Sequence, residues 1–287
     1  MNILEVRGLE KRYEKFTLDK VSFSLESGYI MGFIGRNGAG KSTTMKAMIN
    51  LIGKDGGEVF IGGRPFLENE TACKREIGFV LGEFDCYKKS TLKKIAAVTR
   101  RFYPEWDDEA YAGYLKRFDL DERKKIGELS AGMKVKFALA LALSHKAKLL
   151  ILDEPTSGLD PVSRDDLLDV FRGIIEDGEH SILFSTHIIS DLEKCADYIT
   201  YIKNGKILAS SDVDSFRESY LLVSGEQEQF ERLKGALVGF KKHAFGFTGL
   251  IRREDEDLFA DCKKAPADLE SIMIYTEQED DHEKPAV

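Results

Sequence analysis

The sequence predicts an α/β fold in which helices cover both faces of a parallel sheet. Short, continuous apolar runs alternate with helical patterns over the first 210 residues, and such runs are typical of strands buried on both faces. A glycine-rich loop follows one run, and an Asp-Glu pair ends another. Both features suit a ligand site at the carboxyl edge of the sheet.

Five apolar runs and one hairpin signal give the order of the expected elements. Runs at 29–34, 77–81, 149–152, 181–185 and 198–202 predict the strands of the sheet. Between about 84 and 145 strand signals give way to helical ones, so we expect a helical insertion there. Asn204-Gly205 marks a hairpin between 199–202 and 206–208, after which a first domain, 1–210, ends.

Residues 211–287 follow as a weakly patterned extension, which we expect to be a small α/β accessory unit. Runs at 220–223 and 248–251 predict strands, and 226–234 predicts a helix. We hypothesise that this unit stabilises a dimer. From Glu277 onward the composition is polar and acidic, which predicts a disordered tail.

Composition and charge exclude several classes of protein. The 287 residues carry a net charge of -8, and the whole acidic excess lies in 212–287, which argues against a nucleic-acid partner. No apolar run approaches the roughly 18 residues that span a bilayer, and the charged segment 1–13 is unlike a signal peptide. The four cysteines form no CxxC pair, which favours reduced thiols. We expect a cytoplasmic protein able to dock on a membrane partner.

The glycine-rich loop fits the phosphate-binding pattern G-x-x-x-x-G-K-[ST], between a strand and a helix-compatible run. Backbone N–H groups of such a loop form an anion nest at a helix N-terminus. An ordinary glycine-rich turn is the alternative. The predicted nucleotide-binding residues are Gly35, Arg36, Asn37, Gly38, Ala39, Gly40, Lys41, Ser42 and the adjoining Thr43. Lys41 neutralises the β- and γ-phosphates, and Ser42 offers its hydroxyl to Mg²⁺.

Two further strands end in polar side chains at the same edge of the sheet. Asp153 and Glu154 follow 149–152; we expect Asp153 to reach Mg²⁺ and Glu154 to accept a proton from, or orient, the attacking water. His187 follows 181–185. Taken alone, the carboxylates could cap a surface turn, and the histidine could be structural.

These motifs occur in the order that resembles the ABC ATPase family, over roughly residues 2–210. Leu129-Ser130-Ala131-Gly132-Met133 resembles the family signature, 157–160 resembles its D-loop, and Ser185-Thr186-His187 resembles the segment that carries its switch histidine. The resemblance implies a P-loop NTPase cassette: a RecA-like core, an antiparallel β subdomain and a helical subdomain. It also implies that Ser130 and Gly132 of the signature contact the γ-phosphate of ATP held by the opposite subunit, that Asp160 of the D-loop is a nucleotide-binding residue, and that Glu154 and His187 are catalytic.

Four positions match or depart from the family pattern in an informative way. Tyr13 matches the aromatic residue that stacks on adenine, although a core tyrosine is an alternative. Ala131 and Met133 replace Gly and Gln in the signature while Ser130 and Gly132 remain. Glu83 stands where the Q-loop carries glutamine, so it acts either at Mg²⁺ or at the permease contact.

The segment 102–107 and the variant signature look similar to ATPases of bacterial ABC-2-type exporters. The leading hypothesis is therefore an ATP-hydrolysing subunit that dimerises around two Mg-ATP, as a homodimer or with a related subunit, and drives export through separate permease chains. It would sit on the inner face of the cell membrane.

The alternatives are a non-transport ABC ATPase and a catalytically dead regulatory module. Only 86 residues separate Ser42 from Leu129, too few for the long coiled coil of repair relatives. Lys41, Asp153, Glu154 and His187 together argue against a dead module.

Overall fold

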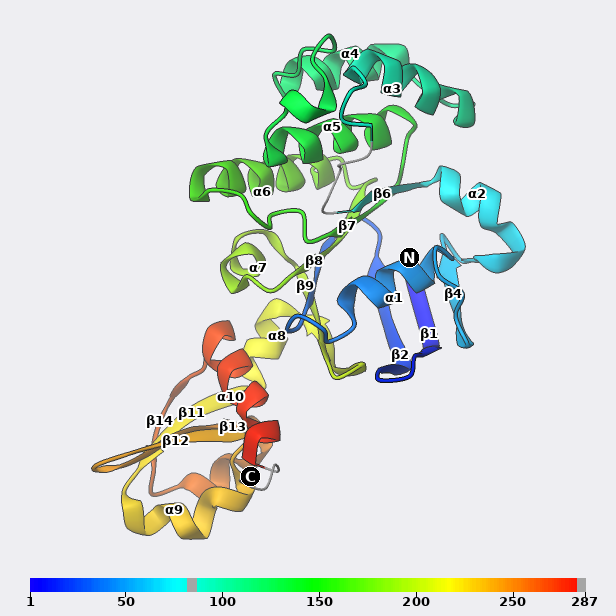
Figure 1. The fold of residues 1–287 in the computed structure, drawn as a ribbon. Helices are drawn as coiled ribbons and strands as arrows, with labels where there is room; N and C mark the ends of the chain where they lie inside the picture. Colours follow the sequence, from blue (N-terminus) through cyan, green and yellow to red (C-terminus); the bar gives the residue numbers. More distant parts are fainter. Residues whose placement is uncertain (82–86, 283–287) are drawn as a thin grey trace. The chain divides into compact units, whose positions relative to one another are not determined.

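The computed structural model describes residues 1–81 and 87–282, and the chain divides into two compact units, Met1–Ser210 and Ser211–Val287. In the described residues, the first unit contains a sheet with strand order β10-β9-β3-β8-β7-β6 (Figure 1). The pairings of β9, β3, β8, β7 and β6 are parallel. The strands are β3 (Ile30–Ile34), β6 (Ile77–Leu81), β7 (Leu149–Asp153), β8 (Ser181–Thr186), β9 (Tyr198–Lys203) and β10 (Lys206–Asp212).

The central strands lie where the apolar runs predict them. Every residue of β3, β7 and β8 is buried, as expected for a sheet covered on both faces. Because all of these parallel strands point the same way, the loops after β3, β7 and β8 meet at one edge of the sheet. The predicted phosphate loop, acidic pair and histidine follow these three strands.

A second sheet, in the order β2-β1-β4-β5, is antiparallel. Its strands are β1 (Asn2–Arg12), β2 (Thr17–Glu26), β4 (Gly56–Ile61) and β5 (Arg64–Pro65). In the second half of β2, the buried residues Val21, Phe23 and Leu25 alternate with exposed ones, the period of a strand with one buried face. They share a core with Phe33 of β3 and Met45 of α1 (Lys41–Met48).

Helices fill the region expected to be helical, and their ends follow from capping residues. α3 (Leu92–Thr99), α4 (Asp108–Arg117) and α5 (Ala131–Ser144) lie together in one helical layer (Figure 1). Asp107 caps α4 by accepting from Ala110 N, and Ser130 caps α5 by accepting from Met133 N. The other helices of the unit are α2 (Glu70–Arg75), α6 (Pro161–Ile175) and α7 (Ile189–Cys195).

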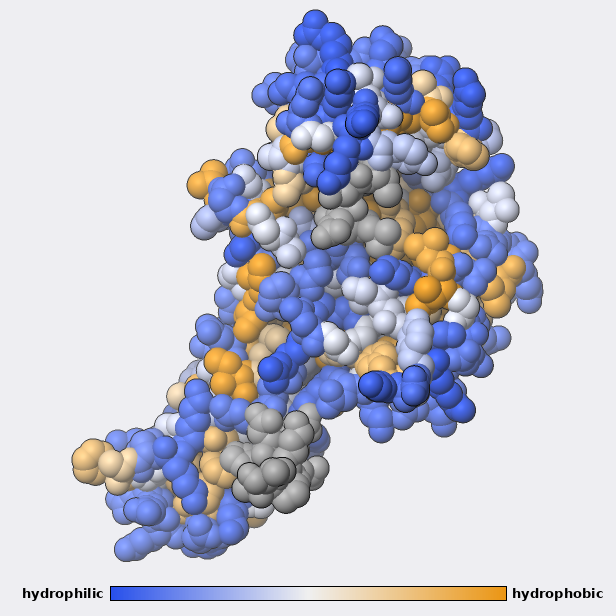
Figure 2. All heavy atoms as spheres, in the orientation of Figure 1, coloured by the Kyte–Doolittle hydropathy of each residue, from blue (hydrophilic) through white to orange (hydrophobic). Residues whose placement is uncertain are grey.

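The second unit has its own sheet, in the antiparallel order β12-β13-β11-β14. The elements are α8 (Val213–Glu218), β11 (Tyr220–Gly225), α9 (Gln227–Leu233), β12 (Gly239–His243), β13 (Gly246–Arg252), β14 (Lys263–Pro266) and α10 (Leu269–His282). Phe230, Phe247 and Phe259 form its separate core. At the turn between β12 and β13, Phe245 is 90% exposed, and Figure 2 shows hydrophobic atoms at the tip of this hairpin.

Two features of the second unit differ from the sequence-based expectation. α10 continues to His282, so 277–282, where we expected a disordered tail, is helical. The helix continues because the apolar residues Ile272 and Met273 are buried and anchor its first half. The strands β12 and β14 and the helices α8 and α10 come in addition to the predicted elements.

None of the helices in 1–81 and 87–282 combines the length and the apolar character that crossing a bilayer requires.

Candidate functional site

The phosphate loop joins β3 to α1 in a conformation that requires glycine. Gly40 lies at the N-cap of α1 with φ of 113°, and a side-chain carbon there would lie 2.7 Å from Leu18 Cδ2 and 2.8 Å from Phe16 Cζ. Gly38 also has a positive φ, 86°. The loop backbone therefore curls tightly over the helix N-terminus, the geometry that turns N–H groups toward an anion.

Lys41 folds back into this loop and is only 5% exposed. Its Nζ donates to Gly35 O at 2.7 Å and approaches Arg36 O at 3.4 Å. It also forms an ion pair with Glu154 Oε1 at 3.1 Å. A buried ammonium group held by these partners is a fixed positive charge at the centre of the loop.

Asp153 ends β7 with a buried carboxylate that joins two neighbouring elements. Its Oδ1 accepts hydrogen bonds from Ser42 Oγ at 3.0 Å and from Ser185 Oγ at 2.7 Å. Ser42 lies in the first turn of α1, and Ser185 lies near the end of β8. A serine hydroxyl beside a carboxylate is the oxygen donor set that Mg²⁺ takes from proteins when phosphate supplies the rest, so these residues fit that ion.

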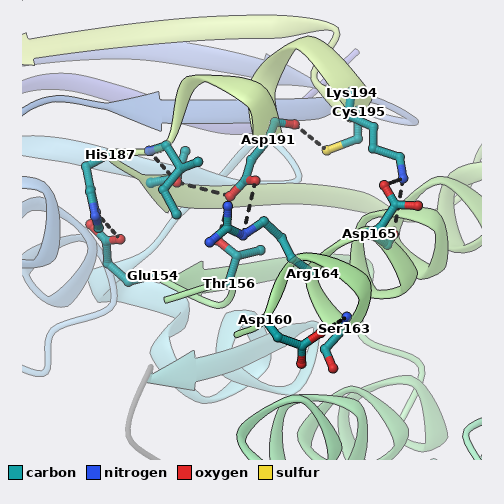
Figure 3. Close-up of polar contacts among 12 residues, drawn as sticks. Glu154, Thr156, Asp160, Ser163, Arg164, Asp165, His187, Asp191, Lys194 and Cys195 are labelled. Atoms are coloured by element: carbon teal, nitrogen blue, oxygen red, sulfur yellow. Dashed lines mark hydrogen bonds and ion pairs between the residues drawn. The ribbon is translucent and has the colours of Figure 1, made fainter. Parts of the chain in front are cut away.

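Glu154 connects the lysine to the histidine. Its Oε1 faces Lys41, and its Oε2 accepts from His187 Nδ1 at 2.8 Å, so the two side chains point toward one another (Figure 3). The Glu154 backbone has φ of 51°, a strained value for this residue type, and its N–H donates to Ser185 Oγ at 2.8 Å. Backbone and side chain thus hold the carboxylate at a fixed place.

The signature and D-loop residues occupy helix starts. Ser130 caps α5 through Met133 N at 3.2 Å, and Asp160 caps α6 by accepting from Val162 N and Ser163 N at 3.0 Å each. Hydrogen bonds from the Ser163 hydroxyl and from these backbone groups lower the Asp160 pKa. Gly132 lies buried beside them, in the first turn of α5. Among the described residues, neither Ser130 nor Asp160 bonds to Lys41 or Ser42.

The remaining predicted residues lie in different settings. Tyr13, after β1, is 49% exposed, with Lys11 Nζ 5.5 Å from its ring centre. Thr43 is partly buried in the first turn of α1. Glu83 lies outside the described residues.

Sequence reasoning missed Ser185 as a member of the site, although it lies two residues before His187. Its hydroxyl donates to Asp153 and accepts from the Glu154 N–H, so it links the two carboxylate residues. A serine in an apolar strand has no spacing rule that marks it, and only the pairing of β7 with β8 brings it to Asp153.

A cavity of about 590 Å³ lies at the other edge of the sheet and is separate from this site. Its lining includes Tyr103, His145, Lys148 and His180. Lys148 and His180 immediately precede β7 and β8, whereas the phosphate loop follows β3. The cavity therefore belongs to the amino ends of the strands.

Comparison with known proteins agrees with this geometry. Residues 18–157 match the family model described as ABC transporter. The ABC transporter ATP-binding protein YtrB of Bacillus subtilis is 30% identical, with 77% of this chain and 76% of that protein covered. The bacitracin transport ATP-binding protein BcrA of Bacillus licheniformis is 31% identical, with coverage of 75% and 72%. The lantibiotic transport ATP-binding protein SrtF of Streptococcus pyogenes is 33% identical, with coverage of 74% and 92%.

Solved structures give the same result for the fold. A structure of an ATP-binding subunit of an ABC transporter superposes with a TM-score of 0.67 at 28% identity, covering 75% of this chain and 92% of that one. An ATP-binding cassette in its ADP conformation gives 0.64 at 24% identity, with coverage of 75% and 92%, a likeness of fold alone. The predicted α/β cassette fold is confirmed. This chain belongs to the ATP-binding subunits of ABC transporters, and it is an ATPase.

Proposed function

We propose that two copies of this chain, or one copy and a related subunit, bind two Mg-ATP at a shared interface and hydrolyse them to drive export through a separate membrane permease. The observation that carries the proposal is the row Lys41, Glu154 and His187, linked at 3.1 Å and 2.8 Å beside the Ser42–Asp153 pair. This row combines a phosphate-binding cation with a carboxylate that accepts protons.

The phosphate loop and its neighbours bind the nucleotide. N–H groups of 35–43 and the Lys41 ammonium neutralise the phosphate oxygens, and Tyr13 offers an exposed ring to adenine. Ser42 and Asp153 would hold Mg²⁺, and Glu83 is a further candidate ligand. When bound, the ion neutralises charge on the β- and γ-phosphates.

Glu154 is the residue that we assign to the attacking water. Its carboxylate lies next to Asp153 in sequence but points to Lys41 and His187, so its charge stays apart from the Ser42–Asp153 pair. Such a carboxylate can orient the water and accept its proton. His187 fixes the second carboxylate oxygen and thereby the direction from which the first one acts.

Ser130, Gly132 and Asp160 are assigned to the partner's nucleotide. Two of them cap helices whose N-termini carry partial positive charge, and neither bonds to Lys41 or Ser42 of its own chain. An anion bound at these helix N-termini would therefore belong to the nucleotide of a second subunit. A solved cassette of the same fold is dimeric with ADP and Pi bound.

The relatives support a proposal for the partner and the location. BcrA and SrtF are named for transport of bacitracin and of lantibiotics, and another relative for Nod factor export. We infer that this chain works on the inner face of the cell membrane, attached to a permease that selects the exported cargo. No role for nucleic acid enters this scheme.

Replacement of Glu154 by Gln tests the catalytic assignment. The amide keeps size and hydrogen bonding but loses basicity, so we expect the ATP turnover rate to fall roughly 10²- to 10⁴-fold, equivalent to about 3–5 kcal/mol. ATP binding should persist, and an ATP-bound dimer should accumulate. Phosphate release and size-exclusion chromatography with Mg-ATP measure both effects.

Lys41→Ala provides the contrasting variant. It removes the fixed cation from the loop, so nucleotide affinity should fall and the protein should remain monomeric with Mg-ATP. Near-normal turnover by Glu154→Gln would remove Glu154 from the catalytic role and direct attention to Glu83 or His187.

A further inference from the structure

A buried carboxylate beside the site is the basis of a further inference. Asp191, in the first turn of α7, is 0% exposed. Its Oδ2 accepts from Thr156 Oγ1 at 2.6 Å and from Thr186 Oγ1 at 3.3 Å. Both threonines are themselves fully buried. A buried charge is costly unless it is paired and hydrogen-bonded, so this carboxylate has to be held by its neighbours.

The two threonines place Asp191 between the two halves of the hydrolysis site. Thr156 lies two residues after Glu154, at the start of the loop that leads to Asp160. Thr186 immediately precedes His187, and its hydroxyl also accepts from Ile188 N at 3.0 Å. One carboxylate oxygen therefore ties the loop after β7 to the loop after β8 (Figure 3).

The other carboxylate oxygen is part of an incomplete ion pair. Asp191 Oδ1 lies 3.9 Å from Arg164 Nε, and neither atom has a hydrogen-bond partner among the described residues. A charge-assisted hydrogen bond would be about 2.8 Å long, so the pair is roughly 1 Å too open. A buried polar atom without a hydrogen bond costs free energy, so a small movement that closes this gap is favourable.

Arg164 is attached to the elements that we assign to the partner's ATP. It lies in the first turn of α6, and its N–H donates to Asp160 O at 3.0 Å. The preceding Ser163 and Leu159 lie beside the first turn of α5: a side-chain carbon on Gly132 would be 3.9 Å and 3.7 Å from them. A shift of α5, the helix that begins with the signature residues and is called the signature helix below, would therefore displace the start of α6 and move Arg164 relative to Asp191.

We propose that Asp191 is a positioning residue for hydrolysis, and that its ion pair with Arg164 closes when the partner's ATP engages the signature helix. The inference rests on the dimeric site proposed above. Closure adds a contact between the start of α6 and Asp191, which already holds Thr186 beside His187. Engagement of the partner's nucleotide would thereby align Glu154 and His187 at this chain's own nucleotide. The step is a conformational change, and no covalent bond is made or broken.

The test uses the full chain in the Glu154→Gln background. Arg164→Gln, Asp191→Asn and the double variant are compared by the Mg-ATP concentration that gives half-maximal dimer and by the unfolding temperature without nucleotide. Each single variant should raise the required Mg-ATP about tenfold, within the usual range of coupling between sites. The double variant should need no more Mg-ATP for half-maximal dimer than the single variant with the larger effect. Without nucleotide, the coupling between the two substitutions in unfolding should be smaller than their coupling in the dimer assay, because the pair is still open.

Lys194→Gln is the matched control. Lys194 already forms completed ion pairs from α7 to Asp165 and Asp169 of α6, the latter at 3.4 Å. It joins the same two helices away from the loops, so its loss should change dimer formation less than twofold. Arg164 is partly exposed, so we expect Arg164→Gln to fold. This variant therefore measures the change in the Mg-ATP concentration for half-maximal dimer even where Asp191→Asn fails to fold.

A second readout separates positioning from general stability. With Glu154 restored, Arg164→Gln should lower kcat about tenfold and leave the Kd for ADP within about twofold, because the pair acts after nucleotide has bound to the phosphate loop. Additive effects in the dimer assay, or equal coupling with and without Mg-ATP, would overturn the inference. Failure of the Glu154→Gln parent to dimerise contradicts the proposed function itself, and is recognised in the parent before any pair variant is compared.

Discussion

At the scale of single residues, the site combines groups that sequence motifs name with groups that only the fold brings in. Lys41, Ser42, Asp153, Glu154 and His187 are predictable because each stands at a fixed offset from a strand end or a glycine. The connecting hydroxyls are not, because a serine or threonine inside an apolar strand has no pattern of its own. Strand pairing alone decides which carboxylate it meets.

Replacement of Ser185 by Ala should damage hydrolysis and stability together. It removes a donor to Asp153 and leaves the Glu154 N–H without its acceptor, a loss of about 1–3 kcal/mol in unfolding free energy. Because Glu154 then loses its backbone anchor, we expect kcat to fall more than tenfold. Urea unfolding and phosphate release measure the two effects.

Ser181→Ala is the matched control at the other end of β8. Ser181 is equally buried, and its hydroxyl accepts from Gly28 N at 2.9 Å, away from the phosphates. Its loss should lower stability by a similar amount and leave kcat near the parent value. Equal kcat in the two variants would show that Ser185 acts on the fold alone.

At the scale of secondary structure, predictability depends on how strong each element's own pattern is. The core strands are continuous apolar runs and stand out in the sequence. β14, Lys263–Pro266, is an exposed edge strand with two lysines and a proline, which suits an edge but resembles a loop. The sequence does not predict α10, and its end from Glu277 is expected to be disordered because that polar end is helical only as a continuation of the buried first half.

The end of α5 should make the protein acid-sensitive. His145, its C-cap residue, is 5% exposed and stacks on Tyr103 with ring centres 3.7 Å apart. Burial lowers the His145 pKa from 6.5 to about 4, with Nδ1 3.1 Å from Arg75 O. Between these values the unfolded chain binds a proton that the folded chain does not. Stability is therefore complete above pH 6.5 and falls as the pH drops to about 4, by up to about 3 kcal/mol.

Urea unfolding of the parent and of His145→Phe across pH 7.5 to 4.5 measures this contribution. The phenyl ring keeps the stacking but cannot take up a proton, so the stability difference between parent and variant should shift in favour of the variant as the pH falls. Parallel pH profiles would exclude His145 as the source of acid sensitivity.

At the scale of the whole molecule, the two units differ in what their sequence reveals. The first unit carries an ordered set of motifs, so its family, fold and chemistry follow from the sequence. The second unit carries none. Its aromatic core and its antiparallel sheet are built from short, weakly alternating segments, and contacts between distant residues such as Phe230 and Phe247 decide the arrangement. Its function therefore has to be approached through its surface.

The exposed hairpin of the second unit gives a way to test whether this unit supports dimerisation. Phe245 is 90% exposed, and burial of such a ring against a partner subunit would contribute about 1.5–3 kcal/mol. We expect Phe245→Ser to weaken the Mg-ATP-dependent dimer of the Glu154→Gln protein about tenfold. ATP affinity should stay unchanged, because every assigned site residue lies in Met1–Ser210.

Leu258→Ser, at another exposed apolar side chain of the same unit (58%), is the control that separates a specific contact from general surface hydrophobicity. Light scattering against protein concentration measures the dimer, and removal of 211–287 should reproduce the Phe245→Ser result. A truncated chain that dimerises and hydrolyses ATP as the full chain does would rule out this role for the second unit.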